Sequence, residues 1–234
     1  MTDIAQSDRS TVVVDSDPWR RLSRSTGIAG LVAFVLIFTP IIAISTQGEP
    51  PFTATAEEAY AFVVNAGDLG WRNLASTATV LAGLVLLWFI VGFALLLARA
   101  EGNPPWRSMA AGASGLMLTA YLVLDVSWVA AMNRAADIDS GLAAYAFDVG
   151  NRGFANVWIA MGSFAIATGW VIISTRMLPL SLGWWAVAAG AGLVLASFAW
   201  TSQGWLVPYL LFWIWMVVIC VLLIRRGGRG GRQP

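Results

Sequence analysis

Six long apolar runs, separated by polar segments, dominate the hydrophobic pattern of this chain. Each run holds 19 to 25 residues. About 20 residues are needed to cross the hydrocarbon of a bilayer as an α-helix, which rises about 1.5 Å per residue. The pattern therefore predicts an all-α, polytopic membrane bundle of six transmembrane helices. The predicted spans are Thr26–Ser45, Leu74–Ala98, Ser108–Met132, Phe154–Thr175, Leu182–Trp200 and Leu206–Ile224.

The segments that follow the first and third spans are long, and each contains an amphipathic stretch. Thr55-Ala-Glu-Glu58 fits a capping box, in which Thr55 caps the helix and Glu58 reaches back to the cap. This predicts a short helix over residues 56–65. A second short helix is predicted over residues 139–149, with Asp139 as its cap. We expect both amphipathic helices to lie outside the membrane, over the mouth of the bundle.

These two stretches share a string, Ala59-Tyr-Ala-Phe-Val-Val64 in the first and Ala144-Tyr-Ala-Phe-Asp-Val149 in the second. One interpretation is that spans 1–2 and spans 3–4 are parallel repeats of a single hairpin with an outer helix. The other is chance similarity in an alanine-rich chain. The sequence leaves both open.

The placement of arginine predicts the orientation. The chain has fourteen basic residues, and all of them are arginine. With the N-terminus inside, eleven of the fourteen fall in cytoplasmic segments, so the positive-inside rule predicts an N-in/C-in topology. Residues 1–25 form a polar cytoplasmic tail, 26–224 the transmembrane domain and 225–234 a basic cytoplasmic tail. That basic tail is either a topology anchor with a disordered end or a segment attracted to anionic headgroups.

Composition supports a membrane protein and excludes several chemistries. The chain is 58% hydrophobic and only 12% charged, against about 25% charged residues in a soluble domain. A net charge of +1 gives no reason to expect a nucleic acid partner. A single cysteine, Cys220, precludes an internal disulfide, and the absence of histidine removes bis-histidine haem and histidine-based proton relays. We expect no cofactor and no metal site.

Asp125 is the acidic residue within an apolar span, and such a residue is costly enough to mark a functional site. Tyr121 and Trp128, at i−4 and i+3, share its helix face. Polar residues cluster near the outer ends of spans 2, 3 and 4. They are Arg72, Asn73, Arg134, Arg152 and Asn156.

Two interpretations of Asp125 remain. In the first, it lies in a polar outer cavity and binds a cation, a proton or a polar ligand group. In the second, it is a structural residue, ion-paired with Arg72 or Arg152 or protonated and bonded to an asparagine.

Two other features of the spans have a structural and a functional interpretation. Gly112-Ala-Ser-Gly115 matches the string around the serine of rhomboid proteases, but no histidine or lysine is present to serve as a base. Ala111, Gly115 and Thr119 instead indicate a small-residue stripe that lets another helix approach closely. Tryptophans inside the spans are either packing residues or the lining for a lipid tail. These are Trp88, Trp158, Trp170, Trp213 and Trp215.

Three longer motifs carry a resemblance. An EEAYAF stretch follows the first span, LLARAEG closes the second, and RMLPLSLGW opens the fifth. Together they resemble a group of uncharacterised six-span integral membrane proteins of actinobacteria, itself loosely similar to a larger bacterial membrane family of unknown function. The resemblance implies a multi-pass protein of the bacterial plasma membrane and supplies no catalytic residue.

We therefore expect a non-enzymatic integral membrane protein. It would be either an accessory or scaffold subunit with a membrane-protein partner, or a binder of a lipid-like ligand. The alternative is a small proton- or cation-coupled transporter that uses Asp125. An enzyme ranks third, because residues suited to acid–base or nucleophilic work are nearly absent from the spans.

Overall fold

The computed structural model describes residues 17–46, 48–67, 70–124 and 127–228, and the regular secondary structure within these ranges is entirely helical. Some side chains inside these helices, noted below, lie outside the description. The helices are α1 (Asp17–Ser45), α2 (Ala56–Gly67), α3 (Arg72–Glu101), α4 (Trp106–Leu124), α5 (Ser127–Asn133), α6 (Ser140–Thr175), α7 (Leu180–Phe198), the short 3-10 helix η1 (Gln203–Trp205) and α8 (Leu206–Gly228).

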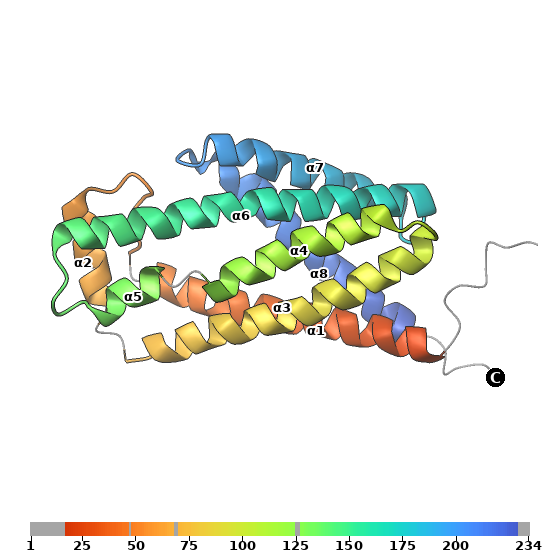
Figure 1. Ribbon diagram of the computed structural model, residues 1–234, viewed down its shortest axis with the longest axis horizontal. Coiled ribbons are helices and arrows are strands. Elements are labelled where there is room, and N and C mark those ends of the chain that lie inside the picture. The colour runs from red at the N-terminus through yellow and green to blue at the C-terminus, as the bar shows by residue number, and fades with distance from the viewer. Residues whose placement is uncertain (1–16, 47, 68–69, 125–126, 229–234) are drawn as a thin grey trace, which may run out of the picture.

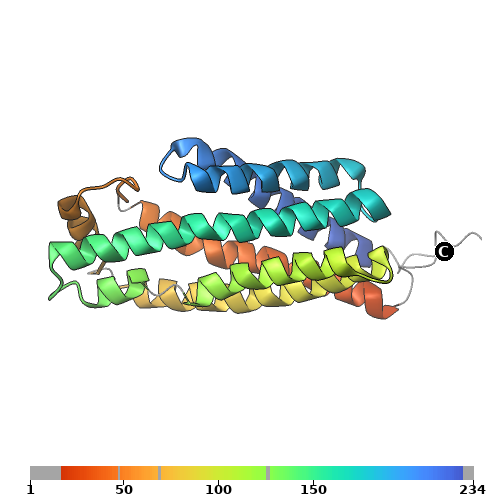
Figure 2. The same cartoon turned by 45° about the horizontal axis from the view of Figure 1, so that its top comes forward.

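Six of these helices pack as a closed ring. Helix α1 packs against α3 and α8, α3 against α4, α4 against α6, α6 against α7, and α7 against α8. Figures 1 and 2 show these helices side by side, with α2 lying across the first turns of α6 at one end. The enclosed core is apolar and includes Phe89, Phe93, Phe164 and Trp215.

The two ends of the bundle differ in charge. One end carries the first turns of α1, the α3–α4 and α6–α7 turns, and the last turn of α8 (Figure 1). We call it the arginine-rich end. Its described arginines are Arg20, Arg21, Arg24, Arg99, Arg107, Arg176, Arg225 and Arg226. The opposite end, which we call the α2 end, holds only Arg72, Arg134 and Arg152 of the described arginines. The predicted partition of arginines between two sides therefore matches the two ends of the fold.

Glycine allows helices α6 and α7 to pack closely. A Cβ at Gly162 of α6 would lie 2.7 Å from the Gly190 carbonyl oxygen of α7, and one at Gly169 would lie 2.6 Å from the Gly183 carbonyl oxygen. The two contacts lie seven residues apart on each helix, from Gly162 to Gly169 in α6 and from Gly183 to Gly190 in α7. The two antiparallel helices therefore touch backbone to backbone over two turns. Close approach through small residues is how helices associate where no water drives them together.

Five helices are long and apolar enough to cross a membrane: α1, α3, α6, α7 and α8 together with η1. The third predicted span, Ser108–Met132, is formed by α4 and α5, and it is not among the five. Helix α4 has 19 residues, but it begins with Trp106 and Arg107. The rest of its first half consists mainly of alanine, glycine and serine, which are only weakly apolar. The described chain thus supports a multi-pass helical membrane protein with five candidate spans.

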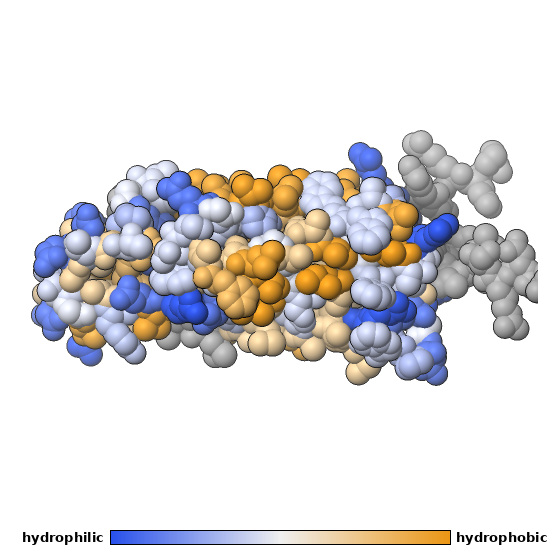
Figure 3. All heavy atoms as spheres, turned by 90° about the horizontal axis from the view of Figure 1, so that it is seen from above, coloured by the Kyte–Doolittle hydropathy of each residue, from blue (hydrophilic) through white to orange (hydrophobic). Residues whose placement is uncertain are grey.

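The outward faces of these helices are apolar in the middle of the bundle. Trp88, Trp170 and Leu195 are 75%, 60% and 69% exposed. Figure 3 shows apolar side chains over the middle of one face and hydrophilic residues toward both ends. Exposed aromatic and aliphatic side chains of this kind are suited to contact with lipid.

The prediction of a second separate outer helix is wrong. Residues 140–149 are the first turns of α6, which continues without a break to Thr175. At about 1.5 Å per residue, its 36 residues rise about 54 Å, well beyond a hydrocarbon thickness of about 30 Å. Glycines at 150 and 153 do not end the helix, because glycine in a helix interior costs only about 0.5–1 kcal/mol relative to alanine. At Gly153 the helix lies close to α4: a Cβ there would lie 3.0 Å from Cε2 of Tyr121.

Candidate functional site

Asp125, the centre of the predicted site, lies outside the described residues, as do the side chains of Trp128 and Arg72. Helix α4 ends at Leu124, and α5 begins at Ser127. Both interpretations of Asp125 therefore stay predictions. The other predicted site residues can be placed.

Tyr121 belongs to the contact between α4 and α6. Its hydroxyl donates a long hydrogen bond of 3.4 Å to the Gly150 carbonyl oxygen, and its ring lies against Gly153. The side chain is half-buried. Tyr121 thus fixes α4 on the projecting part of α6, just below the α2 end.

The remaining predicted residues lie on the surface of the α2 end. Asn73, Arg134, Arg152 and Asn156 are all exposed. The guanidinium carbon of Arg152 lies 5.5 Å from the centroid of the Trp200 ring, a cation–π contact with the segment after α7. Arg134 lies after α5, where it lines a groove. Arg134 and Arg152 therefore lie at the same end of the bundle but contact different neighbours.

The groove lies between α5 and the projecting turns of α6, and it encloses about 250 Å³. Most of its wall is aliphatic or aromatic, and its one charged side chain is Arg134. The lining residues are Ser127, Ala130, Ala131, Arg134, Ile138, Leu142, Tyr145, Ala146 and Val149. No described residue forms a hydrogen bond or an ion pair with the Arg134 guanidinium. The groove therefore combines an apolar wall with a cation at hand for an anionic group.

Helix α2 supports the floor of this groove. Val63 of α2 is fully buried against Ala131, Ile138 and Ala143. Ala59 and Phe62 of α2 pack against Phe147 of α6. The two copies of the shared Ala-Tyr-Ala-Phe string thus face each other, with Tyr60 and Tyr145 directed outward and exposed.

The caps predicted for these two helical segments are confirmed. The Thr55 N–H donates to Glu58 Oε2 at 2.8 Å, and the Glu58 N–H donates to Thr55 Oγ1 at 3.3 Å. The Leu142 N–H donates to Asp139 Oδ1 at 2.8 Å. Side chains local in sequence therefore set where the walls of the groove begin.

Beside the groove, a column of stacked rings closes the α2 end. The Phe52 ring, from the loop between α1 and α2, lies between Trp200 and Trp205, with centroids 5.8 Å and 5.7 Å away. Trp205 in turn stacks on Trp158 of α6 at 5.1 Å. Arg152 extends the column through its contact with Trp200. The sequence analysis missed Phe52, because an apolar loop residue carries no periodic signal.

The tryptophans of the spans divide into two groups. Trp158, Trp213 and Trp215 are at most 4% exposed, so they are packing residues as predicted. Trp88 and Trp170 face outward. None of the five lines the groove.

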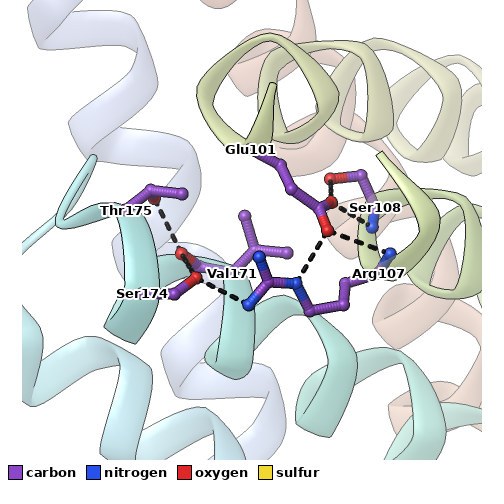
Figure 4. A network of polar contacts seen from close by, with 6 residues as sticks. All are labelled: Glu101, Arg107, Ser108, Val171, Ser174 and Thr175. Atoms are coloured by element: carbon purple, nitrogen blue, oxygen red, sulfur yellow. Dashed lines mark hydrogen bonds and ion pairs between the residues drawn. The ribbon is translucent and has the colours of Figure 1, made fainter. Parts of the chain in front are cut away.

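The arginine-rich end is held by a network around Glu101, the last residue of α3 (Figure 4). The carboxylate accepts hydrogen bonds from the Arg107 N–H and Nε and from the Ser108 N–H and Oγ, at 2.5 to 3.2 Å. Arg107 Nη1 also donates to Ser174 Oγ of α6 at 3.0 Å. The Glu101 side chain is only 2% exposed. This network joins α3, α4 and α6 and leaves the carboxylate no free capacity for a ligand.

The small-residue stripe predicted on the third span is confirmed. A Cβ at Gly115 would lie 2.6 Å from Ile90 Cγ2 of α3, and Ala111 is buried. Ser114, the serine of the Gly-x-Ser-Gly string, shares a 2.7 Å hydrogen bond with Ser163 of α6. Its hydroxyl thus links two helices, and with no histidine or lysine in the chain it lacks a base.

Within the described residues, no three histidine, cysteine, aspartate or glutamate side chains gather into a group that could hold a metal ion. A scan against protein-family models and searches of curated proteins and of solved structures found no match. The resemblance to six-span actinobacterial proteins therefore stays an expectation, and the groove carries the functional argument.

Proposed function

We propose that this protein is a non-enzymatic, multi-pass membrane protein that binds a lipid-like ligand at its α2 end, in the groove between α5 and α6. The ligand is an amphiphile with one alkyl chain on the apolar wall and an anionic headgroup on Arg134. The observation that carries this proposal is the apolar groove of about 250 Å³, lined by an arginine that has no ion-pair or hydrogen-bond partner among the described side chains.

Size and charge define the ligand class. Pockets that enclose whole small molecules measure about 300–1,000 Å³, so a groove of about 250 Å³ suits one chain better than a complete two-chain lipid. An apolar wall favours methylene groups at about 0.8 kcal/mol for each one buried. A cation at the groove favours a carboxylate or phosphate over a neutral or cationic head.

The proposed topology has six spans, with α4 and α5 as the third and with the N- and C-termini in the cytoplasm of a bacterium. Its support is that α4 runs beside α3 and α6 in the ring and that most described arginines lie at one end. In this topology the groove opens at the outer face of the plasma membrane. The accessory-subunit role and the transport role of Asp125 have no comparable observation in their favour.

The test uses spin-labelled stearic acid with the purified full-length protein in nanodiscs. We expect a motionally restricted fraction that falls at least fivefold in Leu142→Trp, because the larger side chain fills the groove. Arg134→Gln should weaken binding about tenfold, as expected for one charge-assisted hydrogen bond worth about 1.5 kcal/mol.

Leu195→Trp is the matched control, since Leu195 is exposed on α7 and does not line the groove. It should leave the restricted fraction unchanged. If all three variants retain the wild-type fraction, the groove is not the ligand site and the proposal fails.

A further inference from the structure

Arg99, near the end of α3, lies over an aromatic ring at the arginine-rich end. Its guanidinium carbon lies 4.1 Å from the centroid of the Trp19 ring of α1. Its Nη1 atom is buried and has no hydrogen-bond partner. Within the described residues, this side chain makes no hydrogen bond and no ion pair. A guanidinium carries five donors in a rigid fork, so Arg99 is fixed in place while its hydrogen-bonding capacity is unused.

The surrounding charge is positive. The last turn of α8 packs against the first turns of α1: a Cβ at Gly227 would lie 2.6 Å from the Arg20 carbonyl oxygen and 2.8 Å from Arg24 Cβ. This contact brings Arg20 and Arg24 of α1 near Arg225 and Arg226 of α8. Glu101 is the one acidic side chain that the structure describes at this end, and Arg107 and Ser108 occupy it. Arg99 thus has no counter-charge among the described side chains.

We propose that Arg99 and Trp19 form a binding site for the phosphate group of an anionic lipid in the leaflet at the arginine-rich end. A guanidinium matches phosphate through paired N–H donors, and the Trp19 ring holds its plane fixed, which lowers the entropy lost on binding. Tryptophan is favoured at headgroup depth. The surrounding arginines raise the local concentration of anionic headgroups. This site lies at the opposite end from the α5–α6 groove and does not depend on it.

The test measures the affinity of the full-length protein, purified in a neutral detergent, for added lipid. Phosphatidylglycerol is the probe, phosphatidylcholine is the zwitterionic comparison, and glycerol 3-phosphate is the soluble phosphate comparison. We expect wild-type protein to bind phosphatidylglycerol at least tenfold more tightly than phosphatidylcholine. Arg99→Gln should remove about tenfold in affinity for phosphatidylglycerol, and Trp19→Leu should remove part of it.

Arg21→Gln is the matched control, because it removes the same charge from an exposed position at the same end. It should change the affinity less than twofold. Arg99-dependent binding of glycerol 3-phosphate as tight as that of the lipid would identify free phosphate as the ligand source, and it would support the same site. Equal losses in Arg99→Gln and Arg21→Gln would show unspecific attraction and overturn the proposal, as would unchanged binding in Arg99→Gln. If Arg99→Gln does not fold, the comparison of Trp19→Leu with Arg21→Gln decides in the same way.

Discussion

The two ends of the bundle are stabilised by different interactions, hydrogen bonds to a carboxylate at one end and aromatic stacking at the other. At the arginine-rich end the turns are short, and one buried carboxylate accepts four hydrogen bonds that tie α3 and α4 together. At the α2 end the connections are long, and stacked rings around Phe52 hold them. A saturated carboxylate cannot accept a ligand without losing a partner. At the α2 end, by contrast, Arg134 has no ion-pair or hydrogen-bond partner in the described part of the chain and lies beside an open apolar groove, which is why we propose ligand binding there.

The largest expected effect concerns which end faces outward. Cysteines placed singly at Ser140 and Gly228, both exposed, should differ completely toward an impermeant thiol reagent in intact cells. Ser140→Cys should react and Gly228→Cys should not, because the proposed topology has the arginine-rich end in the cytoplasm. The native Cys220 is buried and serves as an internal unreactive control. Labelling at position 228 alone would invert the proposed orientation.

The next largest effect is expected from the hydrogen-bond network around Glu101. Glu101→Ala should lower the free energy of unfolding by about 3 kcal/mol, because it strands a charged Arg107 and two backbone N–H groups. The measurement is thermal or denaturant unfolding in detergent. Glu57→Ala, at an exposed position in α2, should change stability by less than about 0.5 kcal/mol. Equal stabilities of the two variants would mean that the network around Glu101 does not hold this end.

A smaller effect on stability is expected from the stacked rings around Phe52. Phe52→Ala removes two stacked contacts, each worth about 0.5–1.5 kcal/mol, so a loss of about 2 kcal/mol is expected. Limited proteolysis should also become faster in the loop between α1 and α2. Phe198→Ala removes a ring that is 83% exposed and provides the comparison. Similar proteolysis of both variants would show that the ring column does not hold the loop.

The smallest expected effect tests whether Arg152 contacts Trp200 or pairs with Asp125. Arg152→Gln should cost about 0.5–1 kcal/mol, the value of an exposed cation–π contact, and should change the tryptophan fluorescence. A double-mutant cycle with Asp125→Asn should give a coupling energy below about 0.5 kcal/mol, because the guanidinium lies on Trp200. A coupling of 2 kcal/mol or more would instead establish the predicted ion pair.

Features local in sequence were predictable. The caps at Thr55 and Asp139 depend on residues three positions apart, and the structure confirms both. Helical apolar runs and the partition of arginines also follow from composition along the chain. The break between the second outer segment and the fourth span was wrongly predicted, because the glycines at 150 and 153 weaken a helix without ending it, and α6 is continuous over Ser140–Thr175.

Features that join distant segments were not predictable. Arg107 reaches Ser174 across 67 positions. Phe52 meets the ring of Phe154 in α6 and the ring of Trp200 in the α7–α8 turn. The groove depends on how α5 lies against α6 and on Val63 beneath it. Arg134 was singled out because of its place at a span end, yet its role follows from neighbours that no spacing rule identifies.

The central claim is that an alkyl chain occupies the groove between α5 and α6. The most direct measurement is photocrosslinking of the full-length protein in nanodiscs with a fatty acid that carries a photoreactive group at the end of its chain, followed by peptide mass spectrometry. We predict crosslinks concentrated on Leu142, Ala146 and Val149, which disappear in Leu142→Trp and persist in Leu195→Trp. Crosslinks spread evenly over the exposed apolar faces of α3, α7 and α8, and unchanged in Leu142→Trp, would contradict the account.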